Sequence, residues 1–323
     1  ELRCPLGGIG AGNLSLAGNG ALVDPEMSGY ANKCAYWGMT HFAIKAEQDG
    51  QLVDARALVS DIQGSRTGPS NMPRGYGFGV PRESLQGLPH FKEAEFQAGF
   101  PFANLRLSGC KFPAEVALTA FSPFIPLDED NSSLPAAFFT WQIHNTTDQP
   151  LTYTLALSLS NPFTDGLNQT IRQDGLHGLL LMPVDDKPLA QTRNGHIFAC
   201  VPNGTNVHTQ TYWYKGSWFD SLGVYWEEFT APGTIKDRVY ADDELGGNRR
   251  YVSTGTITET VTVAAGDTCA IQFLVSWYYP WMENNWNPLG DCCGETCDCC
   301  EDLNRNRWKK WYTTVYDNVL GVA

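Results

Sequence analysis

Residues 151–160 read LTYTLALSLS, and their two-residue alternation decides the fold. Leucine or tyrosine occupies every second position, and threonine or serine fills most of the positions between them. Because successive side chains of a strand point to opposite faces, this segment is predicted to be a β-strand buried on one side. Residues 138–144, FFTWQIH, alternate in the same way, and the turn-forming stretch NTTDQP separates the two segments. The pair predicts an antiparallel hairpin.

The same pattern continues on both sides of this pair. Residues 256–263 (TITETVTV) and 269–277 (CAIQFLVSW) flank the turn AAGD, and residues 102–109 and 115–121 alternate similarly. No segment before residue 280 keeps a helical period for three turns. Many strands with frequent Gly, Pro and Asn turns, and without alternating helices, indicate antiparallel sheets. We therefore predict an all-β fold, a large two-sheet antiparallel β-sandwich over residues 1–280.

The pattern changes after residue 280. Residues 281–302 are polar and turn-rich, as in a connector, and residues 307–320 read RWKKWYTTVYDNVL. Apolar side chains there follow helical spacing, which predicts an amphipathic linker helix with an aromatic stripe. The stripe either folds back on the sandwich or begins a second, helical domain beyond this chain. Its members are Trp308, Trp311, Tyr312, Val315, Tyr316 and Val319.

Charge and hydropathy exclude several classes of partner. The 323 residues carry a formal net charge of -13 without any basic run, which argues against nucleic acid and anionic membranes. No apolar run is long enough for a transmembrane segment. The chain begins at Glu1 rather than Met, so a removed signal peptide stays open as an alternative to the cytoplasmic location that we expect.

Half of the ten cysteines crowd into one short tract, DCCGETCDCC, at residues 291–300. Thiolates this close together suit a soft metal such as structural zinc. The tract lacks a second ligand pair at a familiar separation, so a loop of reduced thiols is the alternative interpretation, and no cofactor is expected to be required. The five residues are Cys292, Cys293, Cys297, Cys299 and Cys300.

Four glycines punctuate residues 7–12, GGIGAG. A dinucleotide-binding loop would need a further glycine at position 13 or 15, where the chain has Asn13 and Ser15, and no phosphate-binding Gly-Lys-Ser/Thr follows. Glycines also permit a sharp turn at the edge of a sandwich or a close approach to a neighbouring domain, and both interpretations stay open. The four are Gly7, Gly8, Gly10 and Gly12.

Neither the acids nor the aromatics define an active site. The string E-x-D-x-x-E, which would mount a carboxylate pair on one strand, is absent, and adjacent acids such as Glu227 and Glu228 face opposite ways on a strand. Acids at 128–130 and 242–244 are most simply solvated loops. The densest aromatic group, at 212–229, is either a sugar-stacking platform or part of the core or of a domain interface, and we favour core or interface. The stacking candidates are Trp213, Trp218 and Trp226.

Several segments together resemble the N-terminal domain of glycoside hydrolase family 116, which contains non-lysosomal glucosylceramidase and bacterial β-glucosidases. They are PLGGIGAGNLSLAGNGALVD (5–24), the distinctive SPFIPLDEDNSSLP (122–135), VAAGDTCAIQFLVSWYYP (263–280) and WKKWYTTVYDNVLGVA (308–323). The resemblance covers most of the chain in the same order. It is interrupted by the Cys-rich insertion and by residues 171–206.

The resemblance implies a β-sandwich docked on a helical (α/α)₆ barrel. It further implies retaining hydrolysis of β-glucosides or glucosylated lipids by a Glu nucleophile and an Asp acid/base, both in the helical domain. No catalytic residue is therefore assigned here. We expect a non-catalytic domain that braces the barrel and shapes its pocket rim, with residues 281–323 leading toward it. The interface candidates are Gly7, Gly8, Gly10, Gly12, Trp308, Trp311 and Tyr312.

Two other classes of function are possible alternatives for this sequence. A stand-alone carbohydrate-binding module would use exposed tryptophans in place of a docking surface. A complete sandwich enzyme would need two carboxylates brought together from distant strands.

Overall fold

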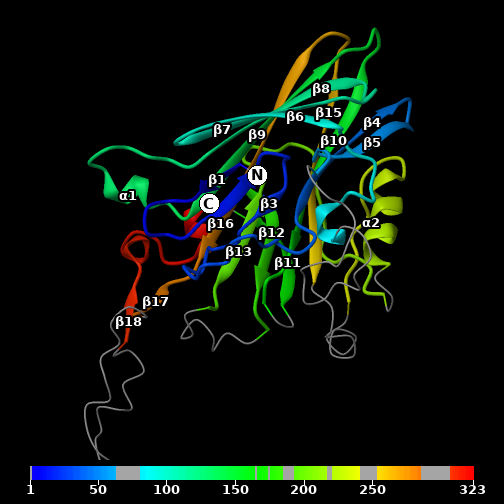
Figure 1. Ribbon diagram of the computed structural model, residues 1–323. Helices are drawn as coiled ribbons and strands as arrows, with labels where there is room; N and C mark the ends of the chain where they lie inside the picture. The colour runs from blue at the N-terminus through cyan, green and yellow to red at the C-terminus, as the bar shows by residue number, and fades with distance from the viewer. Residues whose placement is uncertain are drawn as a thin grey trace, which may run out of the picture.

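Two antiparallel sheets face each other in a sandwich, as the alternation predicts (Figure 1). The computed structural model describes residues 2–62, 81–163, 166–173, 175–184, 193–216, 220–240, 253–284 and 306–323. The smaller sheet has five strands, in the order β14 (Val207–Gln210), β15 (Thr254–Val263), β10 (Leu151–Ser160), β4 (His41–Gln48) and β5 (Gln51–Ala57).

The larger sheet has eight strands and forms the other layer. Every neighbouring pair in it is antiparallel. The strand order is β11 (Leu167–Gln173), β12 (Leu176–Met182), β13 (His196–Cys200), β16 (Thr268–Tyr278), β9 (Ala136–Asn145), β8 (Ala114–Phe121), β7 (Phe102–Ser108) and β6 (Glu93–Gly99).

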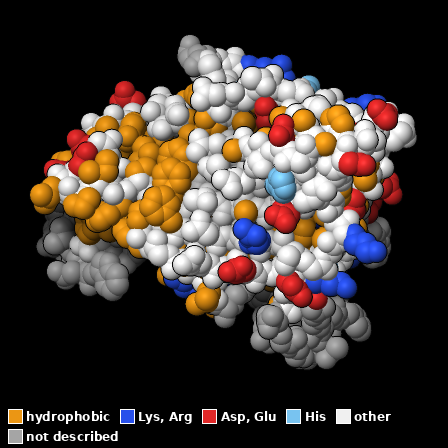
Figure 2. All heavy atoms as spheres, turned by 90° about the horizontal axis from the view of Figure 1, so that it is seen from above, with side chains coloured by type: hydrophobic (Ala, Val, Ile, Leu, Met, Phe, Trp, Pro, Cys, Tyr) orange, Lys and Arg blue, Asp and Glu red, His pale blue; other side chains and the backbone are white. Residues whose placement is uncertain are grey.

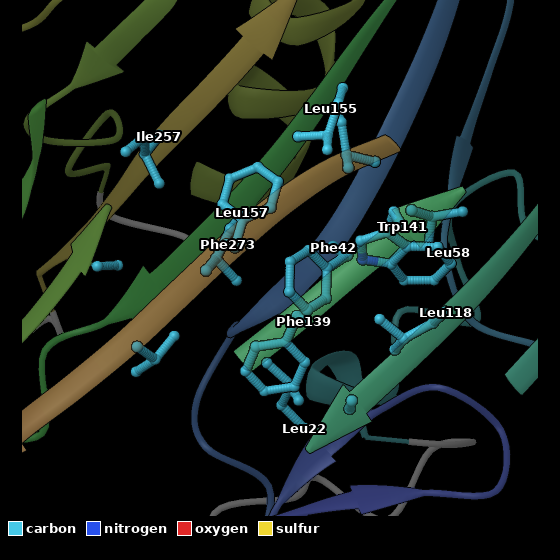
Figure 3. Close-up of a cluster of buried hydrophobic side chains, with 14 of the residues drawn as sticks. Leu22, Phe42, Leu58, Leu118, Phe139, Trp141, Leu155, Leu157, Ile257 and Phe273 are labelled. Atoms are coloured by element: carbon cyan, nitrogen blue, oxygen red, sulfur yellow. The ribbon is translucent and has the colours of Figure 1, made fainter. Parts of the chain in front are cut away.

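Aromatic side chains fill the space between the sheets. The Phe42 ring on β4 lies 5.3 Å from that of Phe139 and 5.5 Å from those of Trp141 and Phe273, which come from β9 and β16 (Figure 3). Leu155 and Leu157 of β10 join the same buried cluster. These are the apolar positions of the alternating segments, so the period-two pattern marks the inner faces correctly.

The predicted hairpin between residues 138–144 and 151–160 is wrong. β9 belongs to the eight-stranded sheet and β10 to the five-stranded one, so the chain crosses between layers at residues 146–150. The buried amide of Asn145 fixes this corner, because its Nδ2 donates to the carbonyl oxygens of Gln149 (2.8 Å) and Val263 (3.1 Å). Residue 263 begins the second crossing, from β15 to β16, so one side chain braces both corners.

Smaller elements close the outer surfaces. The three-stranded sheet of β1 (Arg3–Leu6), β2 (Leu14–Ala17) and β3 (Leu22–Val23) contributes Leu6, Leu14 and Leu22 to the main core. The helix α2 (Ser221–Thr230) packs on the outer face of the five-stranded sheet against Ala43 and Ala156. The remaining short elements are η1 (Arg82–Ser84) and α1 (Glu129–Ser132).

The C-terminal residues do not form the continuous helix predicted for 307–320. They form β18 (Arg307–Lys309), which pairs with β17 (Trp281–Glu283), then the 3₁₀ turn η4 (Trp311–Thr314) and the short helix α4 (Val319–Val322). The Asn318 side chain accepts hydrogen bonds from the amides of Leu320 and Gly321, so a new helix starts there. The segment folds back on the outer face of the eight-stranded sheet, one of the two outcomes that the sequence left open.

Candidate functional site

The glycine-rich turn serves mainly the sandwich itself. Gly7 and Gly12 have φ values of +148° and +85°, which residues other than glycine rarely adopt. A Cβ on Gly8 would collide with the backbone of Ser133 and Leu134, and one on Gly12 with the backbone of Met27. Three of the four predicted interface glycines are therefore needed within the domain.

The tip of the same turn is free of such contacts. A Cβ on Gly10 would have no atom within 4 Å, and the neighbouring Ile9 is exposed. The Ile9 amide donates to the carbonyl oxygen of Ser132 at 2.8 Å, which holds the tip against α1. Within the glycine-rich turn, only this tip is exposed and available to touch another domain.

The C-terminal segment reaches the same helix from the other side. Trp311 Nε1 donates to Asp130 Oδ1 at 3.0 Å, so the glycine turn and the C-terminal tryptophans, predicted separately as interface groups, meet at α1. Trp308 and Trp311 keep 42% and 54% of their surfaces exposed. These two tryptophans are free to contact a partner.

Tyr312 and Lys310, by contrast, anchor the segment inside the domain. The buried Lys310 Nζ donates to the carbonyl oxygens of Met27 (3.2 Å) and Ser28 (3.0 Å), and burial lowers the pKa of Lys310 to about 8. Tyr312 is buried against Tyr278, and burial raises the pKa of its hydroxyl. Tyr312 therefore positions the exposed tryptophans and does not itself reach an interface.

Most described members of the aromatic group at 212–229 are core, whereas Tyr214 is 39% exposed. Trp213 stacks on Tyr225 with ring centroids 4.0 Å apart, and its Nε1 donates to Thr256 Oγ1 at 2.8 Å. Trp213 is buried, so it presents no ring face to a sugar, and Trp226 is half-buried on α2. Trp218 lies outside the described residues.

The acids have structural roles or lie on exposed surfaces. Asp128 caps α1 through the Asn131 amide, and its hydrogen bonds with Asn131 lower the pKa of its carboxyl group. Glu227 and Glu228 lie on α2 rather than on a strand, and Glu228 pairs with Arg238. The acids at 242–244 lie outside the described residues.

The proposed zinc ligands, Cys292, Cys293, Cys297, Cys299 and Cys300, also lie outside the described residues. Across the described part of the chain, no group of three or more His, Cys, Asp or Glu is placed to hold a metal ion. Cys200 is buried, which raises the pKa of its thiol to about 12, so this thiol is protonated at neutral pH.

One surface was missed by the sequence analysis. Phe102, Phe121 and Phe138 are cross-strand partners on β7, β8 and β9, on the outer face of the eight-stranded sheet. The Phe121 and Phe138 rings stack with centroids 4.9 Å apart, and the Phe102 ring lies 5.7 Å from that of Phe121. We name this surface, with the neighbouring exposed residues of the 122–128 segment, the aromatic patch. Its members are Phe102, Phe121, Phe124, Ile125, Leu127 and Phe138.

The signal for this surface is present in the sequence. Phe121 and Phe138 occupy the face of their strands that elsewhere carries polar side chains such as Thr119 and Thr140. An aromatic residue on the polar side of an alternating strand marks a second buried surface.

Fold and surface together define a large antiparallel β-sandwich with an apolar outer patch and without a metal group in its described residues. The chain matches the family described as "beta-glucosidase 2, glycosyl-hydrolase family 116 N-term" over residues 3–322. It therefore belongs to this family of N-terminal domains of glycoside hydrolase family 116. The resemblance noted in the sequence is confirmed.

Comparison with solved structures gives remote matches. A polysaccharide lyase superposes with a TM-score of 0.37 at 8% identity over 86% of this chain and 32% of the lyase. A protein described as a kojibiose phosphorylase from the human microbiome gives a TM-score of 0.31 at 8% identity, over 59% of this chain and 20% of that protein. The chain thus spans about a third or less of these proteins. Comparison with curated protein sequences gives no match.

Proposed function

We propose that this chain is the non-catalytic N-terminal domain of a retaining β-glucosidase or glucosylceramidase-type hydrolase. It braces a helical (α/α)₆ catalytic domain and shapes the rim of that domain's pocket. The family match over residues 3–322 carries the proposal, since an N-terminal domain of this family implies a catalytic partner domain in the same enzyme. The substrate, a β-glucoside or glucosylated lipid, is bound through that partner.

The geometry around α1 supports the bracing role. The Ile9–Gly10 tip and Trp311 are exposed and each is hydrogen-bonded to α1. Trp308 is exposed on the same C-terminal segment as Trp311, and Tyr312 and Lys310 anchor that segment. A rigid support with exposed apolar side chains suits a permanent contact between domains.

Turnover of an aryl β-glucoside tests the proposal. The isolated chain is expected to show no hydrolysis above buffer, and the full-length enzyme is expected to hydrolyse the substrate. Turnover by the isolated chain would show instead that the sandwich is a complete enzyme.

A glycan array tests the carbohydrate-binding alternative. We expect no specific binding by the isolated chain, because Trp213 is buried and bonded to Thr256. Binding that is lost in Trp226→Ala but kept in the exposed control Val53→Ala would favour a sugar-binding module.

Three further parts of the proposal concern setting and cofactors. We propose a cytoplasmic location and no required cofactor. We also propose the five clustered cysteines as candidate ligands of a structural zinc ion. Elemental analysis of the purified chain gives the zinc content per chain, and a value near zero under reducing conditions would remove the metal proposal. None of the described helices has the length and hydropathy needed to cross a membrane.

A further inference from the structure

An apolar row runs across the outer face of the eight-stranded sheet. Cross-strand pairing aligns Phe102 with Phe121, Phe121 with Phe138, Phe138 with Leu274, and Leu274 with Cys200. Because directly paired residues share a face, these five side chains form one line across five strands.

Only half of this row is covered. Leu274 and Cys200 are buried beneath Val319 and Val322 of the C-terminal segment. Phe138 is half-buried at the edge of that cluster, and Phe102 at the far end is 47% exposed. The uncovered part of the row therefore lies directly beside the part that the C-terminal segment covers.

The patch extends beyond the row. Phe124 and Ile125 are exposed in the segment after β8, Leu127 is fully exposed, and the Phe124 ring contacts that of the exposed Phe100 with centroids 5.0 Å apart. Seen from above, the molecule has hydrophobic side chains gathered on one side and charged side chains spread over the other (Figure 2). Contiguous apolar surfaces of this kind mark interaction sites on soluble proteins.

The adjacent row on the same face is polar. Thr119 Oγ1 donates to Asn104 Oδ1 at 2.9 Å, and Gln272 Nε2 donates to Thr140 Oγ1 at 3.1 Å. On this side the apolar area ends at the row and has a defined edge. On the other side it continues into Ala136, Phe198 and Leu180, which belong to the cluster that the C-terminal segment covers.

The chemistry of the patch suits a protein surface. Its rings are phenylalanines, which offer no hydrogen bonds, whereas a sugar site combines ring faces with polar groups aimed at hydroxyls. An N-terminal domain of this family has a catalytic partner domain in the same enzyme, and the C-terminal segment, with Val322 buried, already covers the neighbouring part of this face.

We infer that the aromatic patch is the surface on which the catalytic domain of the same enzyme docks, continuing the layer begun by the C-terminal segment. This inference rests on the proposed function and adds the docking surface to it. The outer face of the eight-stranded sheet then becomes an inner layer of the assembled enzyme, and the glycine tip and Trp311 form the edge of the contact.

Hydroxyl-radical footprinting of the full-length enzyme and of the isolated chain tests the inference. Phe102, Phe124 and Leu127 are expected to oxidise at least fivefold more slowly in the full-length enzyme. The matched controls are Leu52 and Val53 on β5, of which Val53 is 48% exposed, and their rates are expected to stay within twofold.

A substitution test complements the footprint. The double variant Phe102→Asp/Leu127→Asp is expected to speed proteolytic separation of the domains in the full-length enzyme at least fivefold. The control Leu52→Asp/Val53→Asp is expected to leave that rate unchanged. Both pairs are exposed, so neither change perturbs the core.

The outcomes separate the two proposals. Protection confined to residues other than the patch overturns the docking surface and leaves the bracing role standing. Equal oxidation throughout residues 2–323 in both samples overturns the bracing role as well. Protection of the patch that depends on the concentration of the isolated chain makes a second copy the occupant and overturns the inference.

Discussion

The Tyr312 hydroxyl and the Tyr279 backbone exchange two hydrogen bonds, one in each direction. The hydroxyl donates to the Tyr279 carbonyl oxygen at 2.7 Å and accepts from the Tyr279 amide at 2.7 Å. Tyr279 directly follows β16, so this pair ties the C-terminal segment to a central strand of the sandwich. Both groups are buried, so water cannot replace either bond.

Tyr312→Phe is expected to lower the free energy of unfolding by about 2–4 kcal/mol, because it leaves a buried amide and a buried carbonyl unpaired. Chemical denaturation of the isolated chain measures the loss. Tyr316→Phe, on the same segment but only half-buried, is the control and is expected to change stability by less than about 0.5 kcal/mol. Equal losses in the two variants would contradict the role assigned to the Tyr312 hydroxyl.

Gly8→Ala is expected to destabilise the domain by more than about 3 kcal/mol, since its Cβ would collide with the Ser133–Leu134 backbone. Gly10→Ala meets no atom and is expected to cost about 1 kcal/mol, for its φ of +69° alone. Thermal unfolding compares the two variants. A smaller loss for Gly8 than for Gly10 would show that the turn does not pack on α1 as described.

The corner residue Asn145 carries a separate expectation. Asn145→Ala removes the buried amide that braces both crossings between the sheets, and a loss of about 2–4 kcal/mol is expected. Gln142→Ala, exposed on the same strand, is the control with an expected change below about 0.5 kcal/mol. Urea unfolding of the two variants measures both changes. An unchanged free energy of unfolding in Asn145→Ala would show that the two crossings are stable without the Asn145 side chain.

Buried His41 predicts acid sensitivity. Its ring lies against Trp213 and Tyr225, and burial lowers the pKa of His41 from 6.5 to about 4. Between pH 6.5 and 4 the unfolded chain binds the proton and the folded chain does not, so stability falls as the pH falls through this window. The contribution of His41 approaches about 1.4 kcal/mol per pH unit.

Free energies of unfolding measured from pH 7 to pH 4.5 test this expectation. The slope is expected to be shallower in His41→Phe than in the wild type, whatever the absolute stability of the variant. Parallel slopes would show that the His41 imidazole gains its proton in the folded domain as readily as in the unfolded chain.

Local sequence patterns predict which face of a strand is buried, but they do not predict which strands pair with each other. The alternation of residues 151–160 predicts correctly which side chains are buried, yet the assignment of β9 and β10 to one hairpin is wrong. A five-residue loop joins two strands equally well within a sheet or across a sandwich. The choice depends on the Asn145 amide and on partners more than 100 residues away, such as Val263.

The C-terminal segment shows the same limit. Helical spacing of Trp308, Tyr312 and Val319 predicted one amphipathic helix, but cross-strand pairing of β18 and the cap at Asn318 divide it. Spacing records which residues are apolar, and Tyr312 and Val319 are indeed buried. The backbone conformation that buries them is determined by packing against the outer face of the eight-stranded sheet.

By itself, the amino-acid order determined the fold class, the inner faces of the strands and the family, because each of these depends on residue types at short, regular separations. Tertiary structure alone decided which strands share a sheet, that Tyr312 is core, and that Phe102, Phe121 and Phe138 form one surface. Those three phenylalanines are separated by up to 36 positions in the chain and become neighbours only through antiparallel pairing. The sequence marks single aromatic residues on the polar sides of these strands, but only hydrogen bonding between strands decides that the three rings meet.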